Sequence, residues 1–473
     1  MERLNKPSAP RYSRLREWVV GCAPNDLVVV KFGGSVLNGS PGFLAAGRLV
    51  LGLLESGLEP VVVVSAVKGV TDALLSSFER RDPGVGGAVG KTYLSIAREL
   101  GLPPESVRDV SLASAEVSKL LWAAEVLGQW TPRVRDLVVS YGERLSAALM
   151  AGLLRRLGVE ARWLGGGEAG IVTDGEFGDA TPLYGYTEGV IRERLEPMLE
   201  EGVVPVVAGF TGATREGDTT LLGRGGSDLT ATLLASALGA GRVVLYTDVP
   251  GILSGDPRVV GEPRRVGYMS YEEAWEVARL GLRKFHPRTF EPLIAGGLGV
   301  EVVVSDLRGR STRIGPGRGG PPLKVVSLSR GVARLVVRGP SMAGKRGFLS
   351  RLAGLLAGRG VNILAIRQPP SETAIELVVD ERDLPAAVEE LGARSGAAGV
   401  RLEVERGFDV VSIVGWGAVE ALPEALSAAE KTGGRLLSTG ELSPSISILA
   451  RGRTSPELAR LLHRRVVESW VTG

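Results

Sequence analysis

The sequence predicts a three-layer, mostly parallel α/β domain followed by two small α+β modules. Apolar runs rich in valine alternate with helical patterns along residues 27–305, as expected for a parallel sheet covered by helices. After a stretch dense in glycine and proline, a βαββα pattern occurs twice. The length of 473 residues fits about three globular units.

The composition excludes several classes of protein. Hydrophobic residues make up 44% and charged residues 23% of the chain, so it is not a disordered protein. The single cysteine, Cys22, excludes a disulfide framework, and two histidines beside one cysteine exclude the usual zinc clusters. The net charge of +3 is too small to indicate nucleic acid, and no apolar run approaches the ~18 residues of a membrane helix. We therefore expect a cytoplasmic protein with no nucleic-acid or membrane partner.

Four segments follow one another along the chain. Residues 1–26 are polar and without periodicity, which predicts an N-terminal extension. Residues 27–312 form the predicted α/β domain, and residues 313–323 form a linker of glycine, proline and arginine. The paired modules occupy residues 324–473.

In the α/β domain, continuous β-branched runs predict strands, and apolar residues at helical spacing predict helices. The strands are expected at residues 27–30, 60–65, 203–208, 243–246 and 300–305. The helices are expected at residues 42–56, 91–101, 112–128, 140–156 and 272–281, with a glycine-rich loop at 81–90.

The two modules have the same predicted order of elements. In the first, strands are expected at residues 333–338, 362–367 and 374–380, with helices at 347–357 and 384–391. In the second, strands are expected at residues 409–414, 435–438 and 445–450, with helices at 421–431 and 456–466. Because neither contains a cluster of catalytic residue types, both are interpreted as binding or dimerisation modules.

A lysine and two glycines follow the first predicted strand. Ligands of parallel α/β sheets bind at the carboxyl ends of the strands, where Lys31, Gly33 and Gly34 stand. The glycines let backbone N–H groups approach phosphate oxygens, and the lysine adds a positive charge. A tight turn with a solvated lysine is the alternative interpretation.

A second glycine-rich segment, residues 222–228, opens a helical run. Ser227 or Asp228 is expected to cap that helix, whose N-terminus favours an anion. Arg224 has the fork geometry for a carboxylate or phosphate, and Asp228 suits an ammonium group. The alternative is an ordinary cap beside a solvated arginine.

Three shorter patterns give different interpretations. Thr247 and Asp248 follow a predicted strand and Arg258 lies in a nearby turn, which together could hold a nucleotide or be a turn alone. The Gly-Lys-Thr at 90–92 is not a P-loop, because valine occupies position 85, where the motif needs glycine. His286 precedes a proline and is interpreted as a structural turn residue.

These segments, together and in this order, resemble those of aspartate kinases. The two βαββα copies resemble the pair of ACT domains of that family. The matching segments are residues 31–35, 64–66 with 71–72, 140–143, 177–178, 209–210, 222–228, 247–252 with 256–258, and 285–287.

The resemblance implies a reaction: phosphoryl transfer from ATP to the side-chain carboxylate of L-aspartate, the first step of lysine, threonine and methionine biosynthesis. The carboxylate is ionised at neutral pH, so no protein general base is needed. Mg²⁺ is expected to arrive on the ATP phosphates, and no metal ligand is assigned. The alternatives are a kinase of glutamate or N-acetylglutamate, and a non-catalytic amino-acid sensor. A dehydrogenase would need a spaced glycine fingerprint that is missing after the first strand.

The resemblance also assigns roles to individual residues. The catalytic group would be Lys31, Gly33, Gly34 and Asp228. The aspartate pocket would contain Thr71, Glu143, Phe177, Gly178, Arg224 and Asp228. ATP would be bound by Lys31, Gly33, Gly34, Ser35, Thr247, Asp248, Arg258 and Lys284, with Arg283 as the alternative to Lys284.

An amino-acid effector and a homodimer or homotetramer are expected through the ACT modules. Gly347 lies in the turn before a predicted helix, where the family binds the effector carboxylate, and Gln368 resembles a glutamine of threonine-controlled relatives. Leu364 stands where lysine-controlled relatives typically place an aspartate, so threonine is favoured over lysine. An unregulated enzyme is the alternative.

Overall fold

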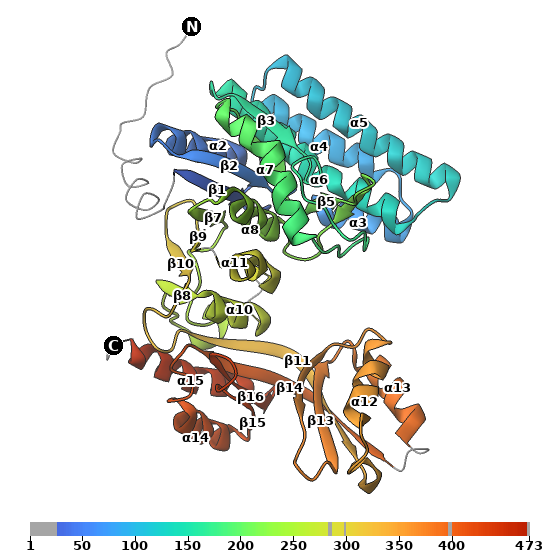
Figure 1. The fold of residues 1–473 in the computed structure, drawn as a ribbon, viewed down its shortest axis with the longest axis vertical. Coiled ribbons are helices and arrows are strands. Elements are labelled where there is room, and N and C mark those ends of the chain that lie inside the picture. Colours follow the sequence, from blue (N-terminus) through green and yellow to red (C-terminus); the bar gives the residue numbers. More distant parts are fainter. Residues whose placement is uncertain (1–25, 282–285, 298, 396–399, 471–473) are drawn as a thin grey trace. The chain divides into compact units, whose positions relative to one another are not determined.

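The computed structural model describes residues 26–281, 286–297, 299–395 and 400–470 (Figure 1). These residues divide into two compact units. The first unit contains residues up to 252, residues 267–271 and most of 285–317. The second contains residues 253–266, residues 272–281 and the chain from Arg318 onward. The predicted α/β domain is therefore not one continuous segment, because two of its parts belong to the second unit.

The first unit is built on an eight-stranded, mostly parallel sheet. The strand order is β3-β4-β2-β1-β7-β9-β10-β8, and the first six strands are mutually parallel. Strand β10 is antiparallel to β9, and β8 is parallel to β10. The bounds are β1 (Leu27–Phe32), β2 (Glu59–Val64), β3 (Ala161–Leu164), β4 (Val204–Ala208), β7 (Arg242–Tyr246), β8 (Tyr268–Ser270), β9 (Glu301–Ser305) and β10 (Ser311–Gly315).

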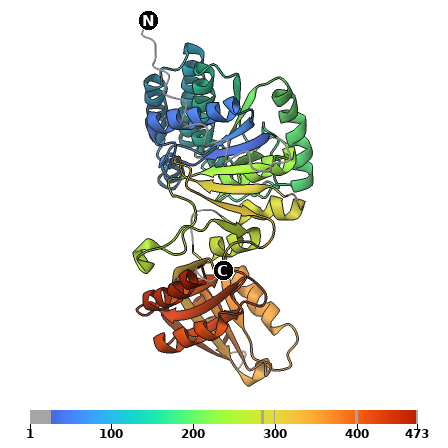
Figure 2. The ribbon, with the colours of Figure 1, turned by 90° about the vertical axis from the view of Figure 1, so that its left-hand side faces the viewer.

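Helices lie on both sides of this sheet, which confirms the three-layer prediction (Figure 2). Helices α2 and α6 pack against β2, whereas α7 packs against β4 and α8 against β1 and β7. The bounds are α2 (Gly39–Glu55), α3 (Val70–Arg80), α4 (Val85–Glu99), α5 (Pro104–Leu127), α6 (Pro132–Arg156), α7 (Tyr184–Glu200), α8 (Gly226–Leu238) and α11 (Glu291–Gly296). A short hairpin, β5 (Thr211–Ala213) with β6 (Thr219–Leu221), precedes α8.

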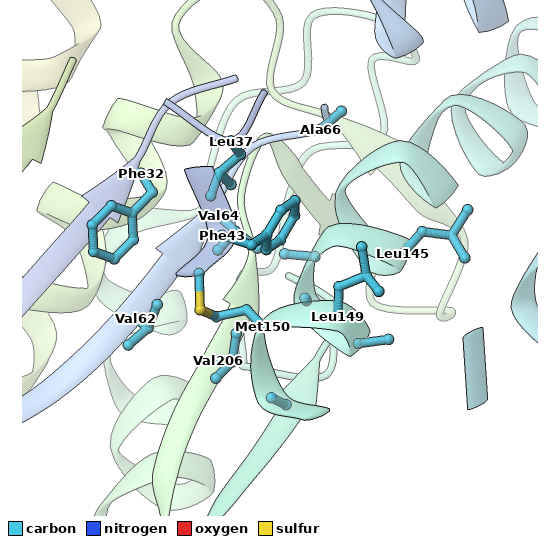
Figure 3. Close-up of a cluster of buried hydrophobic side chains, with 14 of the residues drawn as sticks. Phe32, Leu37, Phe43, Val62, Val64, Ala66, Leu145, Leu149, Met150 and Val206 are labelled. Atoms are coloured by element: carbon cyan, nitrogen blue, oxygen red, sulfur yellow. The ribbon is translucent and has the colours of Figure 1, made fainter. Parts of the chain in front are cut away.

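Helix α6 is the central helix of the core. Its Leu145, Leu149 and Met150 are fully buried, in a cluster with Val62 and Val206 of the sheet (Figure 3). By length and composition alone, α6 is long and apolar enough to span a membrane, although no run of this kind was predicted from the sequence. Because 89% of its most apolar stretch is buried inside the protein, it has the character of a core helix.

The prediction of a glycine-rich loop at residues 81–90 is wrong beyond residue 84, because α4 begins at Val85. A Cβ atom on Gly86 would lie 3.0 Å from the Ser118 Cα, and one on Gly90 would lie 3.0 Å from the Ser114 Cβ. These glycines therefore permit close packing of α4 on α5, and they do not mark a break in the helix.

The second unit is a six-stranded antiparallel sheet with helices. The strand order is β12-β13-β11-β14-β16-β15, and the two long strands β11 and β14 pair along their length. The strands are β11 (Val325–Arg338), β12 (Ile363–Arg367), β13 (Ala374–Asp380), β14 (Arg401–Val414), β15 (Arg435–Thr439) and β16 (Ser445–Arg451). The helices are α12 (Phe348–Ala357), α13 (Leu384–Ser395), α14 (Leu422–Thr432) and α15 (Ser455–Ser469).

The sequence predicted two consecutive modules, and this prediction is wrong. In the structure one module is inserted in the other. The first half of β11, residues 325–330, pairs with residues 409–414 of β14, and Val326 packs in one core with residues of α14 and α15. A bulge at Gly331 (φ 75°) then shifts the register, and Ala333, Leu335 and Val337 pack in one core with residues of α12 and α13. The predicted linker also differs, since β10 occupies residues 311–315.

Two segments from the predicted α/β domain are tied into the second unit by buried polar contacts. The Ser254 hydroxyl lies 2.8 Å from the His463 ring nitrogen, and the Val326 N–H donates to the Ser254 carbonyl at 2.8 Å. Glu273, on α10 (Tyr271–Arg279), binds the Lys324 ammonium through Oε1 at 2.6 Å, with 0% and 1% of the two side chains exposed. A buried pair of this kind holds its two segments together, because removing either partner would leave an uncompensated charge.

Candidate active site

Polar side chains meet at the carboxyl ends of the central strands of the first unit. Strand β1 lies between β2 and β7, with Lys31 level with Val63 and Leu245. The loops that leave these three strands therefore start at one edge of the sheet, as the sequence predicted for a ligand site.

Lys31 and Asp228 form an ion pair at this edge. The Lys31 Nζ lies 2.5 Å from the Asp228 Oδ1, with 13% and 11% of the two side chains exposed. Asp228 lies in the first turn of α8. Neither Asp228 nor Ser227 caps the helix with its side chain, so the prediction that one of them does is wrong. The N-cap is Gly225, whose φ of 78° requires glycine. The α8 N-terminus is thus left without a side-chain cap beside a paired lysine and aspartate.

The loop after β1 has two glycines with different surroundings. The Gly33 N–H donates to the Tyr246 carbonyl at 3.3 Å, and its contact with a phosphate oxygen stays a prediction. A Cβ on Gly34 would lie 2.7 Å from the Ala66 carbonyl oxygen, which explains the second glycine. Among the described residues, the N–H groups of Gly34 and Ser35 have no hydrogen-bond acceptor, and they remain available for an anion.

Glu143 lies buried on α6 with one carboxyl oxygen unsatisfied. Its Oε1 accepts a hydrogen bond from the Ala66 N–H at 3.2 Å. Its Oε2 is buried without a partner among the described residues. Burial raises the pKa of Glu143 to about 8, although the Ala66 N–H and the nearby Thr71 hydroxyl oppose the rise. A buried carboxyl oxygen without a hydrogen-bond donor is suited to bind a cationic donor such as an ammonium group.

Tyr93 of α4, which sequence reasoning missed, positions this part of the site. Its hydroxyl donates to the Gly142 carbonyl at 2.7 Å, accepts from the Val67 N–H at 3.1 Å and lies 3.1 Å from the Ser146 hydroxyl. It thereby ties the loop after β2 to α6, one residue from Ala66 and one from Glu143. In the sequence it is one aromatic residue in a predicted helix, with no local pattern to single it out.

The Phe177-Gly178 segment is held by Asp136, which is fully buried on α6. The Asp136 Oδ2 accepts hydrogen bonds from the Gly178 N–H at 2.7 Å and the Leu221 N–H at 3.1 Å. A Cβ on Gly178 (φ 98°) would come within 2.2 Å of the Arg135 guanidinium. Asp136 therefore joins the 177–178 segment to the strand that leads into the 222–228 loop.

Arg288, also missed from the sequence, holds the 222–228 loop from the other side. Its guanidinium donates to Asp179 at 3.0 Å, to the Leu222 carbonyl at 3.0 Å and to the Ala180 carbonyl at 3.1 Å. Arg224 is exposed and has no carboxylate partner among the described residues. Its charge is therefore available to a ligand.

His286 is a packing residue, in keeping with its structural interpretation. A Cβ on Gly225 would lie 2.2 Å from the His286 Cβ, and the imidazole accepts from the Arg288 N–H at 3.4 Å. Burial, the Arg288 charge and the Arg224 charge all lower the pKa of His286. A neutral imidazole supports the loop without adding charge.

The residues predicted to bind a nucleotide are only partly brought together. Thr247 and Asp248 lie at the carboxyl end of β7, beside the end of β1, and the Thr247 hydroxyl donates to Asp248 at 3.1 Å. Arg258, on α9 (Pro257–Val260), belongs to the second unit and binds Asp256 through two hydrogen bonds of 3.0 and 2.7 Å. Arg283 and Lys284 lie outside the described residues.

No metal centre is formed by protein side chains in the described parts of the chain, where three or more His, Cys, Asp or Glu residues do not cluster. The site holds the Lys31–Asp228 ion pair, an exposed Arg224, a buried Glu143 with one unsatisfied oxygen, and free backbone N–H groups. Such a site suits a small zwitterion beside an anionic phosphate.

Comparisons with known proteins agree with this geometry. Residues 26–304 match the amino acid kinase family, and residues 335–394 match the ACT domain. The chain is 31% identical to lysine-sensitive aspartokinase 3 of Escherichia coli (strain K12) over 457 residues, which cover 94% of this chain and 100% of that protein. It is also 31% identical to an aspartokinase of Geobacillus stearothermophilus, over 83% of this chain and 84% of that protein.

Two crystal structures of E. coli aspartokinase III resemble this chain. The complex with aspartate and ADP (R-state) has a TM-score of 0.79 at 28% identity. The complex with lysine and aspartate (T-state) has a TM-score of 0.77 at 29% identity. Each match covers 93% of this chain and 100% of the other.

The stability of the ligand-free protein should depend on pH through Glu143. Its pKa rises from 4.5 to about 8 on folding, so its favourable contribution is complete below pH 4.5 and is lost as the pH rises to about 8. In urea unfolding over this window, wild type should lose stability relative to Glu143→Gln by up to ~1.4 kcal/mol per pH unit. Parallel pH profiles of the two proteins would contradict a neutral, buried Glu143.

Proposed function

We propose, since this chain belongs to the aspartokinases of the amino acid kinase family, that it phosphorylates L-aspartate with ATP. The side-chain carboxylate oxygen of aspartate forms a bond to the γ-phosphorus, and the bond from that phosphorus to the β-phosphate oxygen breaks. The products are 4-phospho-L-aspartate and ADP. The attacking carboxylate is already ionised at neutral pH, so catalysis consists of alignment and charge neutralisation.

The unsatisfied Oε2 of Glu143 is the observation that carries this proposal. The α-ammonium of aspartate would bind to this oxygen and to Asp228, and its charge would favour the ionised form of Glu143. Arg224 would bind the α-carboxylate, while Thr71 and the backbone of Phe177 and Gly178 would enclose the substrate. A mere sensor would not need a lysine beside free N–H groups.

The phosphate side of the site is proposed around Lys31. Its ammonium, the N–H groups of Gly34 and Ser35 and the α8 N-terminus would stabilise the charge on the transferred phosphoryl group. Thr247 and Asp248 would adjoin the nucleotide, and Arg258 and Lys284 remain proposed ATP ligands. Mg²⁺ is proposed to arrive on the ATP phosphates and would neutralise part of their charge.

Replacing Lys31 should reduce turnover strongly. Lys31→Ala removes a cation at the strand end that leads into the loop with the free N–H groups, and the loss of one such preorganised group lowers kcat by roughly 10²–10³-fold. Steady-state rates of ADP release measure this change. Lys91→Ala, an exposed lysine in the rejected Gly-Lys-Thr motif, is the control and should keep wild-type kcat. Similar rates for both variants would remove Lys31 from the mechanism.

Arg224→Ala should weaken aspartate binding selectively. Loss of a charge-assisted hydrogen bond costs roughly 1.5–3 kcal/mol, which corresponds to about a 10- to 150-fold rise in the KM for aspartate. The KM for ATP should change little. Equal rises in both constants would assign Arg224 to the phosphates.

The proposed effector site is a cavity of about 240 Å³ in the first ACT module, which Gly347 and Gln368 both line. Lys345, Arg346 and the uncapped N-terminus of α12 would bind the effector carboxylate. Glu372, which accepts from the Gly344 N–H at 2.8 Å, would bind the ammonium.

Threonine remains the proposed effector. Lysine carries a second ammonium group, which this lining of two cations and one carboxylate opposes. The E. coli relative is named lysine-sensitive, so lysine is the competing effector.

Threonine at millimolar concentration should inhibit the full-length enzyme, and Gln368→Ala should relieve the inhibition by several-fold or more. Lysine at the same concentration should have little effect. Inhibition by lysine alone would identify the competing effector, and activity unaffected by either amino acid would mean that this cavity has no regulatory role.

Assembly with a second copy is proposed through strand β12. It is an edge strand of the six-stranded sheet, and Leu364 and Ile366 on it are 43% and 44% exposed. An exposed apolar edge of this kind is a template for pairing with another strand.

Ile366→Lys should convert the oligomer to monomer, because a charge on the edge opposes strand pairing. Light scattering measures the mass. Leu442→Lys is the control, since Leu442 is fully exposed in a turn outside this edge. An unchanged mass for Ile366→Lys would place the assembly surface elsewhere.

A further inference from the structure

A second and larger cavity lies in the second unit, separate from the proposed effector site. Its volume is about 600 Å³. Its walls are residues 318–324, which lead into β11, the loop between β14 and α14, and the last turns of α15. No residue that the proposed reaction uses lines it.

The loop that borders this cavity has a counterpart in the first module. Residues 415–421 connect β14 to α14, and residues 339–347 connect β11 to α12. Both are connections from a central strand to the first helix of a module, and each lines one of the two cavities. The inserted arrangement of the modules thus presents the same kind of loop to two separate cavities.

The charges around the larger cavity are partly unpaired. Lys324 is neutralised by Glu273, and Arg465 is paired with Glu424 at 3.0 Å. Arg318 and Glu420 also line the cavity, and neither has an ion-pair partner within the described residues. One available cation and one available carboxylate match the two charges of an amino acid.

Apart from Ser469, the remaining lining consists of glycine, proline and apolar residues and includes an aromatic ring. The Arg318 guanidinium lies 4.0 Å from the centre of the half-buried Trp416 ring, and Pro321 and Pro322 line the same cavity. This combination of an indole, two proline rings and a volume more than twice that of the first cavity favours a large apolar side chain.

We propose that this cavity is a second amino-acid site, selective for a large apolar side chain such as that of phenylalanine, leucine or methionine. The ligand carboxylate binds Arg318, its ammonium binds Glu420, and its side chain packs on Trp416. The Trp416 backbone N–H donates to the Glu273 carboxylate at 3.2 Å, so the loop that carries this tryptophan is bonded to the buried pair that anchors α10. The proposal concerns binding and does not depend on the proposed kinase activity.

Titration calorimetry on the full chain tests the proposal with L-phenylalanine, L-leucine and L-methionine as probes. At least one should bind with one site per chain, also in the presence of saturating L-threonine. Trp416→Ala should weaken this binding at least about tenfold, whereas Trp122→Ala, an exposed tryptophan on α5, should not. Gln368→Ala, in the smaller cavity, should leave it unchanged.

A second variant keeps the test independent of any disturbance of the loop by Trp416→Ala. Glu420 is exposed, so Glu420→Gln should fold normally. It should weaken L-phenylalanine several-fold but leave 3-phenylpropionate, which lacks the ammonium group, unaffected. The proposal is overturned if none of the three amino acids binds at millimolar concentration, if Trp416→Ala and Glu420→Gln both bind like wild type, or if Gln368→Ala abolishes binding.

Discussion

The ion pair between Lys31 and Asp228 is the contact on which the active site depends. It joins the carboxyl end of β1 to the first turn of α8, and little of either side chain reaches solvent. A charge buried in this way is stable only with its partner, so the strand end and the helix start must lie together. The loops after β2 and β7 start at the same edge, because the carboxyl ends of parallel strands coincide.

The rest of the site departs from what would be most stable. Glu143 is buried with one oxygen unsatisfied, which costs free energy in the ligand-free protein. Phe210 has a φ of 67°, a backbone conformation that costs of order 1–3 kcal/mol for such a residue. Its N–H donates to Thr230 of α8 at 3.2 Å, and its carbonyl accepts from the Leu222 N–H at 2.9 Å. The strained residue thus helps to hold the glycine-rich loop, and a bound substrate would satisfy the carboxyl group.

Two segments of the second unit are covalently continuous with strands of the first unit. Asp248, at the end of β7, is followed closely by Ser254, whose hydroxyl is bound to His463 of α15. Burial, with the Arg264 charge, lowers the pKa of His463, so the ring is neutral and acts as a hydrogen-bonding partner. Glu273 is anchored to Lys324 in the same unit, soon after β8 of the first unit. These two segments are therefore held by the second unit and are covalently continuous with β7 and β8 of the first unit.

The sequence by itself determined the elements and motifs whose signals are local. Valine runs bury both faces of a strand, so β1, β2, β4, β7 and β9 were predicted at nearly their observed bounds. Lysine, arginine and glycine motifs could be placed at strand ends, and their order indicated the family. Glu143 stood in one of these motifs, although its burial and unsatisfied oxygen could not be read from its neighbours in sequence.

Only the tertiary structure decided the features that depend on residues far apart in the chain. Tyr93 bonds to Gly142, 49 residues away, and Asp136 bonds to Leu221, 85 residues away. Gly86 and Gly90 are compatible with a loop or with a tight helix contact, and packing against α5 selected the helix. The insertion of one module in the other follows from the pairing of β11 with β14, which no local pattern encodes. Each of these outcomes is set by long-range packing and hydrogen bonding, because local propensity allows more than one conformation at these positions.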